Sequence, residues 1–389
     1  MADAPAIRGG RRLSICLVAG ETSGDLHGAA LCAAMLQSRP DLHLWGVGGE
    51  RMAAEGVELL YRSDEWGAVG FSQGLAKVPV VLPAYLGLRQ RVQARPPDLL
   101  VLIDFGAFNT RLGRRAKAAG VRTLYYFPPR AWDRNLRNPE FLAEVCHHVV
   151  TPFPWSAQLL ARAHIPADYF GHPILDLIPQ QSTAQARTAL GLPEDAQLIG
   201  LFPGSRLHEV RTNTAALLEA ADQMSQPTGE RLFVLSAAPG KAGDWVEARM
   251  SRLPHKNVLV TRDTWAALRA SDLAILCSGS ITLEAAAMNV PMVVFYRGTL
   301  GMALQYLLFY HRRLRFIAMP NILADREIVP ELVTEATRPS ALAQVATSLL
   351  EDADRRNRML EGLREVAGLL GSPGAVAKTA ARALYMAES

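Results

Sequence analysis

Short apolar runs alternate with longer amphipathic segments along most of this 389-residue chain. Each apolar run is followed by glycine or polar residues, and then by apolar residues at helical spacing. Strands buried on both faces of a parallel sheet appear as such runs, because the crossover helices cover them. The alternation therefore predicts an α/β fold with parallel sheets.

The predicted strands form two groups, each with its own helices. The first group comprises residues 13–19, 42–47, 99–103, 123–127 and 149–152, with helices over 26–37 and 109–119. After turns and a polar helix at 171–197, the second group comprises 198–202, 231–236, 257–260, 273–276 and 292–295. Two doubly wound, Rossmann-like domains facing across a cleft are expected, with ligands at the carboxyl ends of the strands.

The domain boundary is predicted near the polar segment at 171–197. We expect an N-terminal domain over residues 1–175 and a C-terminal domain over residues 176–364. Helical patterns at 355–370 and 375–386 come last, and the helices of about 365–389 are expected to pack back on the first domain. A chain of this length is too long for one typical core, which supports two domains.

Composition narrows the classes of function. The residues are 49% hydrophobic and 20% charged with a net charge of +4, so bulk charge does not suggest a nucleic-acid binder. Cys16, Cys32, Cys146 and Cys277 are widely spaced, which argues against a metal site and for reduced, buried thiols in a cytosolic protein. The apolar run at 13–19 is short and leads into a polar turn, so a first core strand is expected there rather than a signal peptide.

Three junctions rich in glycine and serine stand at predicted strand ends. They are "VAGETSGDLHG" (18–28), "LFPGSRLHEVR" (201–211) and "CSGSITLEAAAMNVPMVVF" (277–295). Small residues let a ligand approach the backbone, and the free N–H groups of a following helix attract anions. One such junction is explained by any tight turn, but three together indicate a phosphorylated ligand.

The third junction suggests how a nucleotide is held. Ser278, Gly279 and Ser280 offer backbone N–H groups to a diphosphate, and Ser278 or Ser280 is expected to cap the helix that follows. Glu284, about one turn into that helix, has a carboxylate suited to vicinal hydroxyls such as those of a ribose. The alternative is a capping-box residue, although the spacing from Ser280 is one residue too long.

Two further charged residues are candidates for chemistry. Arg206 stands at a predicted helix entrance, where a cation opposes the helix dipole unless an anion is shared, so it is a candidate phosphate ligand. Glu209 is expected to orient it, and a surface ion pair is the alternative. Asp104 ends a buried apolar run, where partial desolvation favours a general base. A cap of the following turn is equally compatible with its position.

Two connecting segments, 66–88 and 298–320, are unusually apolar. The second places Leu304, Tyr306, Leu307, Leu308, Phe309 and Tyr310 beside Arg312, Arg313 and Arg315. Apolar and aromatic residues followed by basic ones are typical of an interfacial membrane patch. A core helix with a solvated end remains the alternative. No window approaches the roughly 20 apolar residues of a membrane-spanning helix, so a soluble or surface-attached protein is expected.

Taken in order, these motifs resemble the lipid-A-disaccharide synthase family, glycosyltransferase family 19, which has the GT-B fold. The resemblance extends from residue 17 to residue 332. It rests on "LVAGETSGDLHGA", "GVGGERMAAEGVE", "FGHP", "LFPGSRLHEV", "ASDLAILCSGSITLEAAAMNVPMVVFYR" and "MPNILADREIVPEL".

The resemblance implies a specific activity. Such enzymes join UDP-2,3-diacylglucosamine to 2,3-diacylglucosamine 1-phosphate with inversion, giving lipid A disaccharide 1-phosphate and UDP for lipopolysaccharide biosynthesis. It assigns residues 1–175 to the acceptor and 176–364 to the UDP-sugar. It also implies that no metal or other cofactor is needed, that no nucleic acid is bound, that the chain acts peripherally on the inner face of the cytoplasmic membrane, and that a homodimer forms.

The resemblance also implies roles for individual residues. Asp104 matches the family's candidate general base. The residues expected at the substrate and UDP sites are Gly20, Ser23, Gly24, Arg206, Ser278, Gly279, Ser280, Glu284, Asn321 and Glu327.

Two acceptor-side motifs depart from the family pattern. The family usually has "DAPDFN" where this chain has "DFGAFN" (Asp104–Asn109), so its second acidic residue is replaced by Ala107. It usually has "SPSVWAWR" where this chain has "FPPRAWDRN" (127–135), which includes Arg130. Three alternatives therefore stay open: a divergent relative using a UDP-sugar with another lipid or sugar acceptor, an unrelated UDP-sugar enzyme such as a 2-epimerase, and a catalytically silent nucleotide-sugar or lipid-binding protein.

Overall fold

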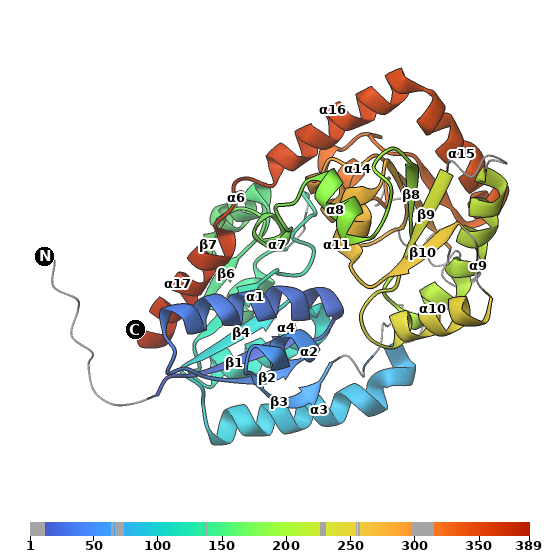
Figure 1. Cartoon of the computed structure of the whole chain (residues 1–389). Coiled ribbons are helices and arrows are strands. Elements are labelled where there is room, and N and C mark those ends of the chain that lie inside the picture. Colours follow the sequence, from blue (N-terminus) through green and yellow to red (C-terminus); the bar gives the residue numbers. More distant parts are fainter. Residues whose placement is uncertain are drawn as a thin grey trace, which may run out of the picture. The chain divides into compact units, whose positions relative to one another are not determined.

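The protein contains two parallel sheets, one in each of two compact units (Figure 1). The computed structural model describes residues 12–63, 66, 74–134, 136, 138–225, 231–253, 255, 257–297 and 315–389. Unit 1 comprises Met1–Trp66, Val78–Phe170 and Gly374–Ser389, and unit 2 comprises Gly67–Lys77 and Gly171–Pro373.

The sheet of unit 1 has seven strands in the order β3-β2-β1-β4-β5-β6-β7, and every neighbouring pair is parallel. Its strands are β1 (Ser14–Ala19), β2 (His43–Gly48), β3 (Glu58–Arg62), β4 (Leu99–Ile103), β5 (Thr123–Tyr126), β6 (His148–Val150) and β7 (Ala167–Asp168). The central strands β1 and β4 are wholly apolar from Ile15 and from Leu99 onward, as burial on both faces requires.

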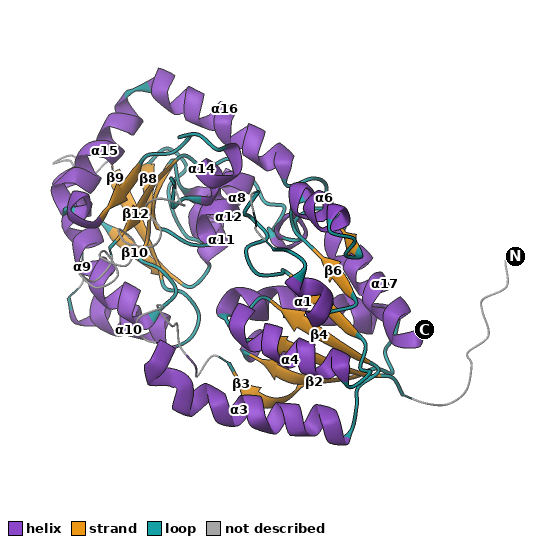
Figure 2. Ribbon diagram, turned by 180° about the vertical axis from the view of Figure 1, so that it is seen from behind, coloured by secondary structure: helices purple, strands orange, loops and turns teal. Residues whose placement is uncertain are grey.

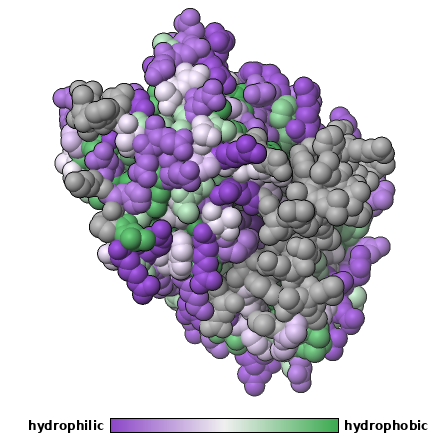
Figure 3. Space-filling model, turned by 90° about the vertical axis from the view of Figure 1, so that its right-hand side faces the viewer, coloured by the Kyte–Doolittle hydropathy of each residue, from purple (hydrophilic) through white to green (hydrophobic). Residues whose placement is uncertain are grey.

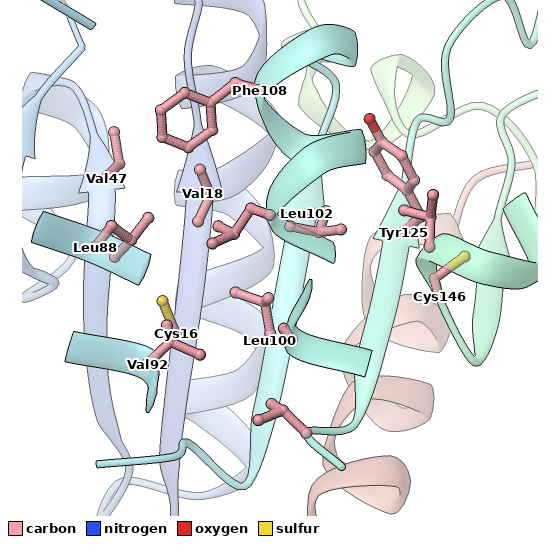
Figure 4. Packing of buried hydrophobic residues seen from close by; sticks show 14 of the residues in the cluster. Cys16, Val18, Val47, Leu88, Val92, Leu100, Leu102, Phe108, Tyr125 and Cys146 are labelled. Atoms are coloured by element: carbon pink, nitrogen blue, oxygen red, sulfur yellow. The ribbon is translucent and has the colours of Figure 1, made fainter. Parts of the chain in front are cut away.

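Helices cover both faces of this sheet (Figure 2). On one face lie α1 (Thr22–Ser38), α2 (Glu50–Ala54) and α17 (Ala375–Glu388), and on the other lie α3 (Gly74–Ala94), α4 (Gly106–Ala118), α5 (Phe141–Val145) and α6 (Pro154–Arg162). Successive strand residues serve opposite faces, so Cys16 and Val18 join the core shown in Figure 4, whereas Leu17 joins the other core.

Helix α17 belongs to unit 1 although it follows all of unit 2 in sequence. Ala380 and Ala383 are buried against α1 and the sheet. The Arg382 Nε lies 2.7 Å from Asp168 Oδ2 on β7, and the Arg122 guanidinium donates to the Met386 carbonyl at 2.9 Å. The preceding helix, α16 (Ala353–Leu369), is part of unit 2.

The sheet of unit 2 has six parallel strands in the order β10-β9-β8-β11-β12-β13. They are β8 (Gln197–Phe202), β9 (Arg231–Ser236), β10 (Val258–Thr261), β11 (Leu273–Cys277), β12 (Met292–Tyr296) and β13 (Glu331–Val333). The helices include α7 (Ile174–Leu177), α8 (Thr183–Ala189), α9 (Leu207–Met224), α10 (Lys241–Arg252), α11 (Thr264–Ala270), α12 (Ile281–Ala287), α14 (Met319–Ala324), α15 (Pro339–Glu351) and the short 3-10 helix η4 (Thr334–Thr337). Helix α15 packs against α9, β11 and β12, whereas α11 packs against α8, β8 and β9.

The ten predicted strands are all present, with bounds within two residues of those expected. Three strands were not predicted: β3, β7 and β13. Strands β7 and β13 are short and each contains an acidic residue (Asp168 and Glu331), so neither shows an apolar run. Strand β3 is a sheet edge with exposed charged residues at both ends. The prediction of reduced, buried cysteines is confirmed, since all four thiols are free and buried.

Among the described residues that are visible in Figure 3, hydrophobic residues form small groups between hydrophilic ones. Within the residues that the structure describes, no helix combines the length and hydrophobicity needed to cross a bilayer.

Candidate active site

The predicted site loops of each unit stand where its strand order reverses. In unit 1 the chain runs outward from β1 to β2 and, in the other direction, from β4 to β5, so β1 and β4 flank the reversal. In unit 2, β8 and β11 do the same. Loops at the carboxyl ends of such strand pairs diverge and leave room for a ligand. All three glycine-rich junctions, and Asp104, follow one of these four strands.

In unit 2, a buried asparagine ties the two loops together. Asn213 on α9 is 1% exposed, and its Nδ2 donates to the Pro203 carbonyl at 2.8 Å and contacts Cys277 Sγ at 3.4 Å. Pro203 follows β8 and Cys277 ends β11, so one side chain fixes both loops. Sequence reasoning missed Asn213, because nothing in the helix pattern shows that an amide points inward.

Arg206 and Glu209 form the entrance of α9. Arg206 is the N-cap residue, and its Nη1 lies 3.1 Å from Glu209 Oε1, while Glu209 Oε2 accepts from the Arg206 N–H at 3.4 Å. Gly204 has φ +114°, and a Cβ there would lie 2.6 Å from the Glu209 carboxylate. The expected contact between Arg206 and Glu209 is therefore present. The Arg206 side chain remains 38% exposed, which leaves the guanidinium accessible to an anion.

The loop Ser278–Ser280 is held by contacts to the segment before α14. Ser278 Oγ donates to the Ile317 carbonyl at 2.8 Å, and Thr282 Oγ1 donates to the Gly279 carbonyl at 2.8 Å. Ser280 is the N-cap residue of α12 but makes no side-chain cap, so the expected capping by Ser278 or Ser280 is wrong. Gly279 is exposed, and a Cβ there would meet no heavy atom of the described residues within 4 Å.

Glu284 lies on α12, facing α11. Its Oε2 accepts a hydrogen bond from Trp265 Nε1 at 2.7 Å. This contact orients the carboxylate without neutralising it, because an indole is an uncharged donor. The Glu284 carboxylate is thus bound by a side chain of the neighbouring helix α11. In a capping box it would instead bind the main chain at the start of its own helix.

Asn321 and Glu327 differ in their surroundings. Asn321 is fully buried, and its amide contacts Val329 O and Glu331 Oε1 through Nδ2 and accepts from the N–H groups of Ile328 and Val329. Two donor and two acceptor contacts saturate an amide, so Asn321 acts by holding the following loop. That loop carries Glu327, which is exposed.

Glu331 supports the same region from β13. Its carboxylate accepts from the N–H groups of Ile317 and Ala318 at 2.8 to 3.1 Å and from Asn321. Burial raises the pKa of Glu331 although these hydrogen bonds oppose the shift. The segment that receives Ser278 Oγ is therefore fixed in turn by a partly buried carboxyl, which the sequence did not reveal.

In unit 1, the glycines of the first junction allow close packing. A Cβ at Gly20 would lie 2.2 Å from the Phe105 ring, which belongs to the loop after β4. A Cβ at Gly24 would lie 3.3 Å from the Ala19 Cβ, so this glycine lets α1 approach β1. Ser23, in the first turn of α1, is partly exposed. The structure thus brings Gly20 beside the loop that carries Asp104, and gives Gly24 a packing role.

Asp104 has an unusual backbone. Asp104 and Phe105 have φ +49° and +48°, in the left-handed region that non-glycine residues seldom occupy. The Asp104 carbonyl accepts from Asn109 Nδ2 at 2.9 Å and from the Tyr125 hydroxyl at 3.0 Å. Asn109 and Tyr125 were not singled out from the sequence, since a contact to a main-chain carbonyl leaves no sequence pattern.

The second departing motif is also irregular. Phe127 and Arg130 have φ +59° and +60°, and Arg130 pairs with Asp133. The Phe127 ring stacks on His27 of α1 with centroids 4.4 Å apart. Burial lowers the pKa of His27 to about 4, so the ring is neutral at physiological pH.

Some predicted features lie outside the described residues. They include Asn135 and most of the second apolar stretch, namely Leu304, Tyr306, Leu307, Leu308, Phe309, Tyr310, Arg312 and Arg313. The exposed Arg315 is described, and its guanidinium lies 5.1 Å from the Phe316 ring centroid.

Comparison with known proteins identifies the family. A model of the family described as "Lipid-A-disaccharide synthetase" matches residues 15–378. The chain belongs to this family. A lipid-A-disaccharide synthase of Trichlorobacter lovleyi is 36% identical over 388 residues, covering 97% of this chain and 99% of the relative. A Myxococcus xanthus protein of the same name is 34% identical over 377 residues, covering 96% and 97%. The family prediction and that of a glycosyltransferase are confirmed.

Solved structures confirm the fold. A putative UDP-N-acetylglucosamine 2-epimerase from Listeria monocytogenes matches with TM-score 0.60 at 16% identity, covering 97% of this chain and 98% of that one. The glycotransferase of kitacinnamycin matches with TM-score 0.59 at 17% identity, covering 97% and 100%. The chain therefore has the GT-B fold of two parallel α/β units, as predicted. At such identities the likeness shows the fold alone.

Proposed function

We propose that this protein joins UDP-2,3-diacylglucosamine to 2,3-diacylglucosamine 1-phosphate, releasing UDP and forming lipid A disaccharide 1-phosphate. The observation that carries the proposal is the family match over residues 15–378, to relatives named lipid-A-disaccharide synthase that the chain covers almost end to end. Glycosyl transfer and a place in lipid A biosynthesis follow from that membership.

The donor nucleotide is assigned to the loops after β8 and β11 of unit 2. The half-exposed Arg206 supplies a cation for the diphosphate, and the exposed Gly279 leaves the backbone of its loop open. Glu284, whose Oε2 accepts a hydrogen bond from Trp265, is assigned to the ribose hydroxyls. As the glycosidic bond to UDP breaks, Arg206 offsets the negative charge that develops on the diphosphate. No metal or other cofactor is invoked for this step.

Asp104 is proposed as the general base. A hydroxyl oxygen of the acceptor attacks the anomeric carbon of the donor, a new C–O bond forms, and the bond from that carbon to the UDP oxygen breaks with its electron pair. The hydroxyl proton passes to the Asp104 carboxylate, and inversion follows from attack on the face opposite UDP. Gly20 and Ser23 lie in the adjoining loop and first turn of α1, and are assigned to the substrate site on that ground.

Acyl chains require an apolar surface, and α3 offers one. Leu82 and Leu86 are 46% and 44% exposed at a spacing of one turn, and Pro79 and Pro83 on the same helix are also exposed. The partly exposed Arg89 and Arg91 lie in the last turns of this helix, and the exposed Arg95 follows its end. Exposed leucines beside cations suit the surface of a membrane with anionic lipids. We assign α3 to the inner face of the cytoplasmic membrane; homodimer formation remains a proposal from the family resemblance.

A divergent acceptor is the second candidate function. It is favoured by Ala107, which lies exposed in the first turn of α4 where the family pattern has an acidic residue, and by Arg130 in the loop after β5. Both changes lie in unit 1, whereas the donor loops lie in unit 2. The donor would then be retained and the acceptor changed.

The deciding experiment is incubation with UDP-2,3-diacylglucosamine, alone and with a panel of acylated glucosamine phosphates, followed by mass spectrometry. We expect UDP and a disaccharide only when an acceptor is present, and a loss of at least ~10²-fold in turnover for Asp104→Asn. Product with a different acceptor would select the second candidate. Conversion of the donor without any acceptor would indicate an epimerase instead, and normal turnover by Asp104→Asn would reject the base assignment.

A further inference from the structure

We propose that Tyr125 and Asn109 are positioning residues for Asp104: they hold its main chain in a left-handed conformation that aims the carboxylate. The proposal rests on the assignment of Asp104 as base. It concerns the main chain of Asp104 rather than its carboxylate, and it assigns a role to two fully buried residues.

The backbone after β4 is strained in two successive residues. Asp104 and Phe105, with φ +49° and +48°, both lie in the region that side chains disfavour, and neither is glycine. A strained conformation persists only where the surrounding structure enforces it. An unstrained turn would point the Asp104 side chain in another direction, because φ determines where Cβ lies relative to the strand.

The enforcing contacts converge on one carbonyl oxygen. The Asp104 carbonyl accepts from Asn109 Nδ2 at 2.9 Å and from the Tyr125 hydroxyl at 3.0 Å. The Asp104 N–H donates to the Tyr126 carbonyl at 3.1 Å, so the peptide units on both sides of its Cα are held. Thr110 hydrogen-bonds the Tyr125 hydroxyl in turn. The carbonyl is thus fixed by two donors from two different elements, β5 and α4.

Asn109 also ties this loop to the neighbouring strand. Besides Asp104, its Nδ2 lies 3.1 Å from the Val18 carbonyl of β1 and 3.2 Å from the Ile103 carbonyl. The residue is fully buried, and its Oδ1 has no hydrogen-bond partner among the described residues. A buried unpaired oxygen is unfavourable, so an apolar residue of similar volume would serve a purely packing role better. The hydrogen bonds that Asn109 Nδ2 donates at the end of β4 offset the cost of the unpaired oxygen.

Tyr125 reaches the loop from within the core. Its ring is fully buried, and Figure 4 shows its hydroxyl directed toward the end of the sheet at which Phe108 lies. Burial and the nearby charge of Asp104 raise the pKa of this phenol, which keeps its proton on the hydroxyl and available to the carbonyl. Tyr125→Phe removes this donor and leaves the ring packing unchanged, so it isolates the contact.

The test compares Tyr125→Phe with Tyr126→Phe in the full-length protein. Tyr126 lies one residue further along β5, with its ring in the core on the opposite face of the sheet, so it is a matched control for loss of a buried hydroxyl. We expect Tyr125→Phe to lower kcat about three- to tenfold, with unchanged KM for the donor and unchanged UDP affinity, because one hydrogen bond to the base's main chain is lost. Tyr126→Phe should retain the wild-type kcat, even if its melting temperature changes.

A double-mutant cycle with Asp104→Glu decides whether Tyr125 acts through Asp104. This variant keeps a carboxylate, so turnover stays measurable, but the carboxylate is displaced by one methylene group from its native position. Tyr125→Phe should then cost less than twofold in kcat. An equal loss in both backgrounds, or wild-type kcat for Tyr125→Phe alone, would overturn the proposal. Normal turnover by Asp104→Asn would instead overturn the base assignment, which makes the two failures distinguishable.

Discussion

Gly279 differs from the other glycines of the candidate site, because packing among the described residues does not explain why it is a glycine. Gly20 and Gly204 are required by the chain, since a Cβ would strike the Phe105 ring or the Glu209 carboxylate. At Gly279 a Cβ would meet no atom of the described residues within 4 Å, and the backbone is not in the left-handed region. Packing among these residues therefore does not require this glycine, whereas the proposed close approach of a diphosphate to the loop would require it.

Gly279→Ala should accordingly fold like the wild type and bind UDP about tenfold more weakly, a loss of about 1.4 kcal/mol. Isothermal calorimetry measures the affinity, and a thermal melt checks the fold. Gly368→Ala is the matched control, because Gly368 on α16 also has open space around it and lies outside the site. Unchanged UDP affinity for Gly279→Ala would remove this loop from the nucleotide site.

His27 gives a residue-scale prediction about pH. Burial lowers its pKa to about 4 in the folded protein, against about 6.5 in an unfolded chain. Between these values the unfolded chain takes up a proton that the folded one does not. His27 therefore does not lower the free energy of unfolding above about pH 6.5. As the pH falls toward 4, the free energy of unfolding decreases, by about 2 kcal/mol at pH 5.

His27→Gln should abolish that part of the acid sensitivity. Thermal unfolding at about pH 7.5 and pH 5 measures it, and the drop in midpoint between the two should be smaller for the variant than for the wild type. His43→Gln is the control, since His43 lies on β2 with its side chain 32% exposed. An equal drop for wild type and His27→Gln would show that His27 is not buried in neutral form.

At the scale of elements, the sequence predicts features that follow a repeating pattern, such as strands and helices. It does not predict single polar contacts between residues distant in sequence. Strand–helix alternation locates ten of the thirteen strands found in the described residues, because burial on both faces enforces apolar runs. It also places the three junctions at strand ends, and the topology then brings them to the points where strand order reverses. Contacts such as those of Asn213, Asn109 and Glu331 are not predictable in this way, since each joins one polar atom to a main chain distant in sequence.

Helix α3 carries the element-scale prediction. Its leucines Leu82 and Leu86 are nearly half exposed, so Leu82→Glu with Leu86→Glu should leave folding intact and reduce association with anionic vesicles several-fold. Gln90→Glu with Gln93→Glu is the control, because it adds the same charge at exposed polar positions of the same helix. Vesicle sedimentation measures both. Equal binding by the two variants would indicate an effect of charge alone, and no binding by the wild type would reject the membrane surface.

At the scale of the whole molecule, the fold does not choose between chemistries. A putative 2-epimerase and a glycotransferase match the chain about equally well, at TM-scores of 0.60 and 0.59. The family, and hence the reaction, is carried by the residues at the strand ends instead. Sequence motifs were therefore more informative about function than the fold was, whereas the structure explains which motif residues contact the chain and which remain open.

Removal of α17 should destabilise unit 1 and leave unit 2 intact. A chain ending at residue 373 lacks the buried Ala380 and Ala383 and the contacts to Asp168 and Arg122. We expect limited proteolysis to cleave within unit 1 at least ~10-fold faster than in the full chain, while unit 2 persists and still binds UDP. Arg382→Ala, which removes the ion pair with Asp168 and the contact with the Tyr385 ring but keeps the helix, should stay close to wild type. Equal protease resistance of the truncated and full chains would contradict a role for α17 in the core of unit 1.

The position of α17 also constrains how the protein is made. On the ribosome, β1 to β7 emerge first, but the helix that completes their core follows only after the whole of Gly171–Pro373 has been translated. At ordinary elongation speeds this interval is roughly 10–40 s. For that time the nascent sheet lacks the helix that covers its apolar face beside α1, whereas unit 2 can complete its own core as soon as Gly171–Pro373 has emerged. The unit that carries Asp104 is therefore the one with the greater need of a chaperone during synthesis.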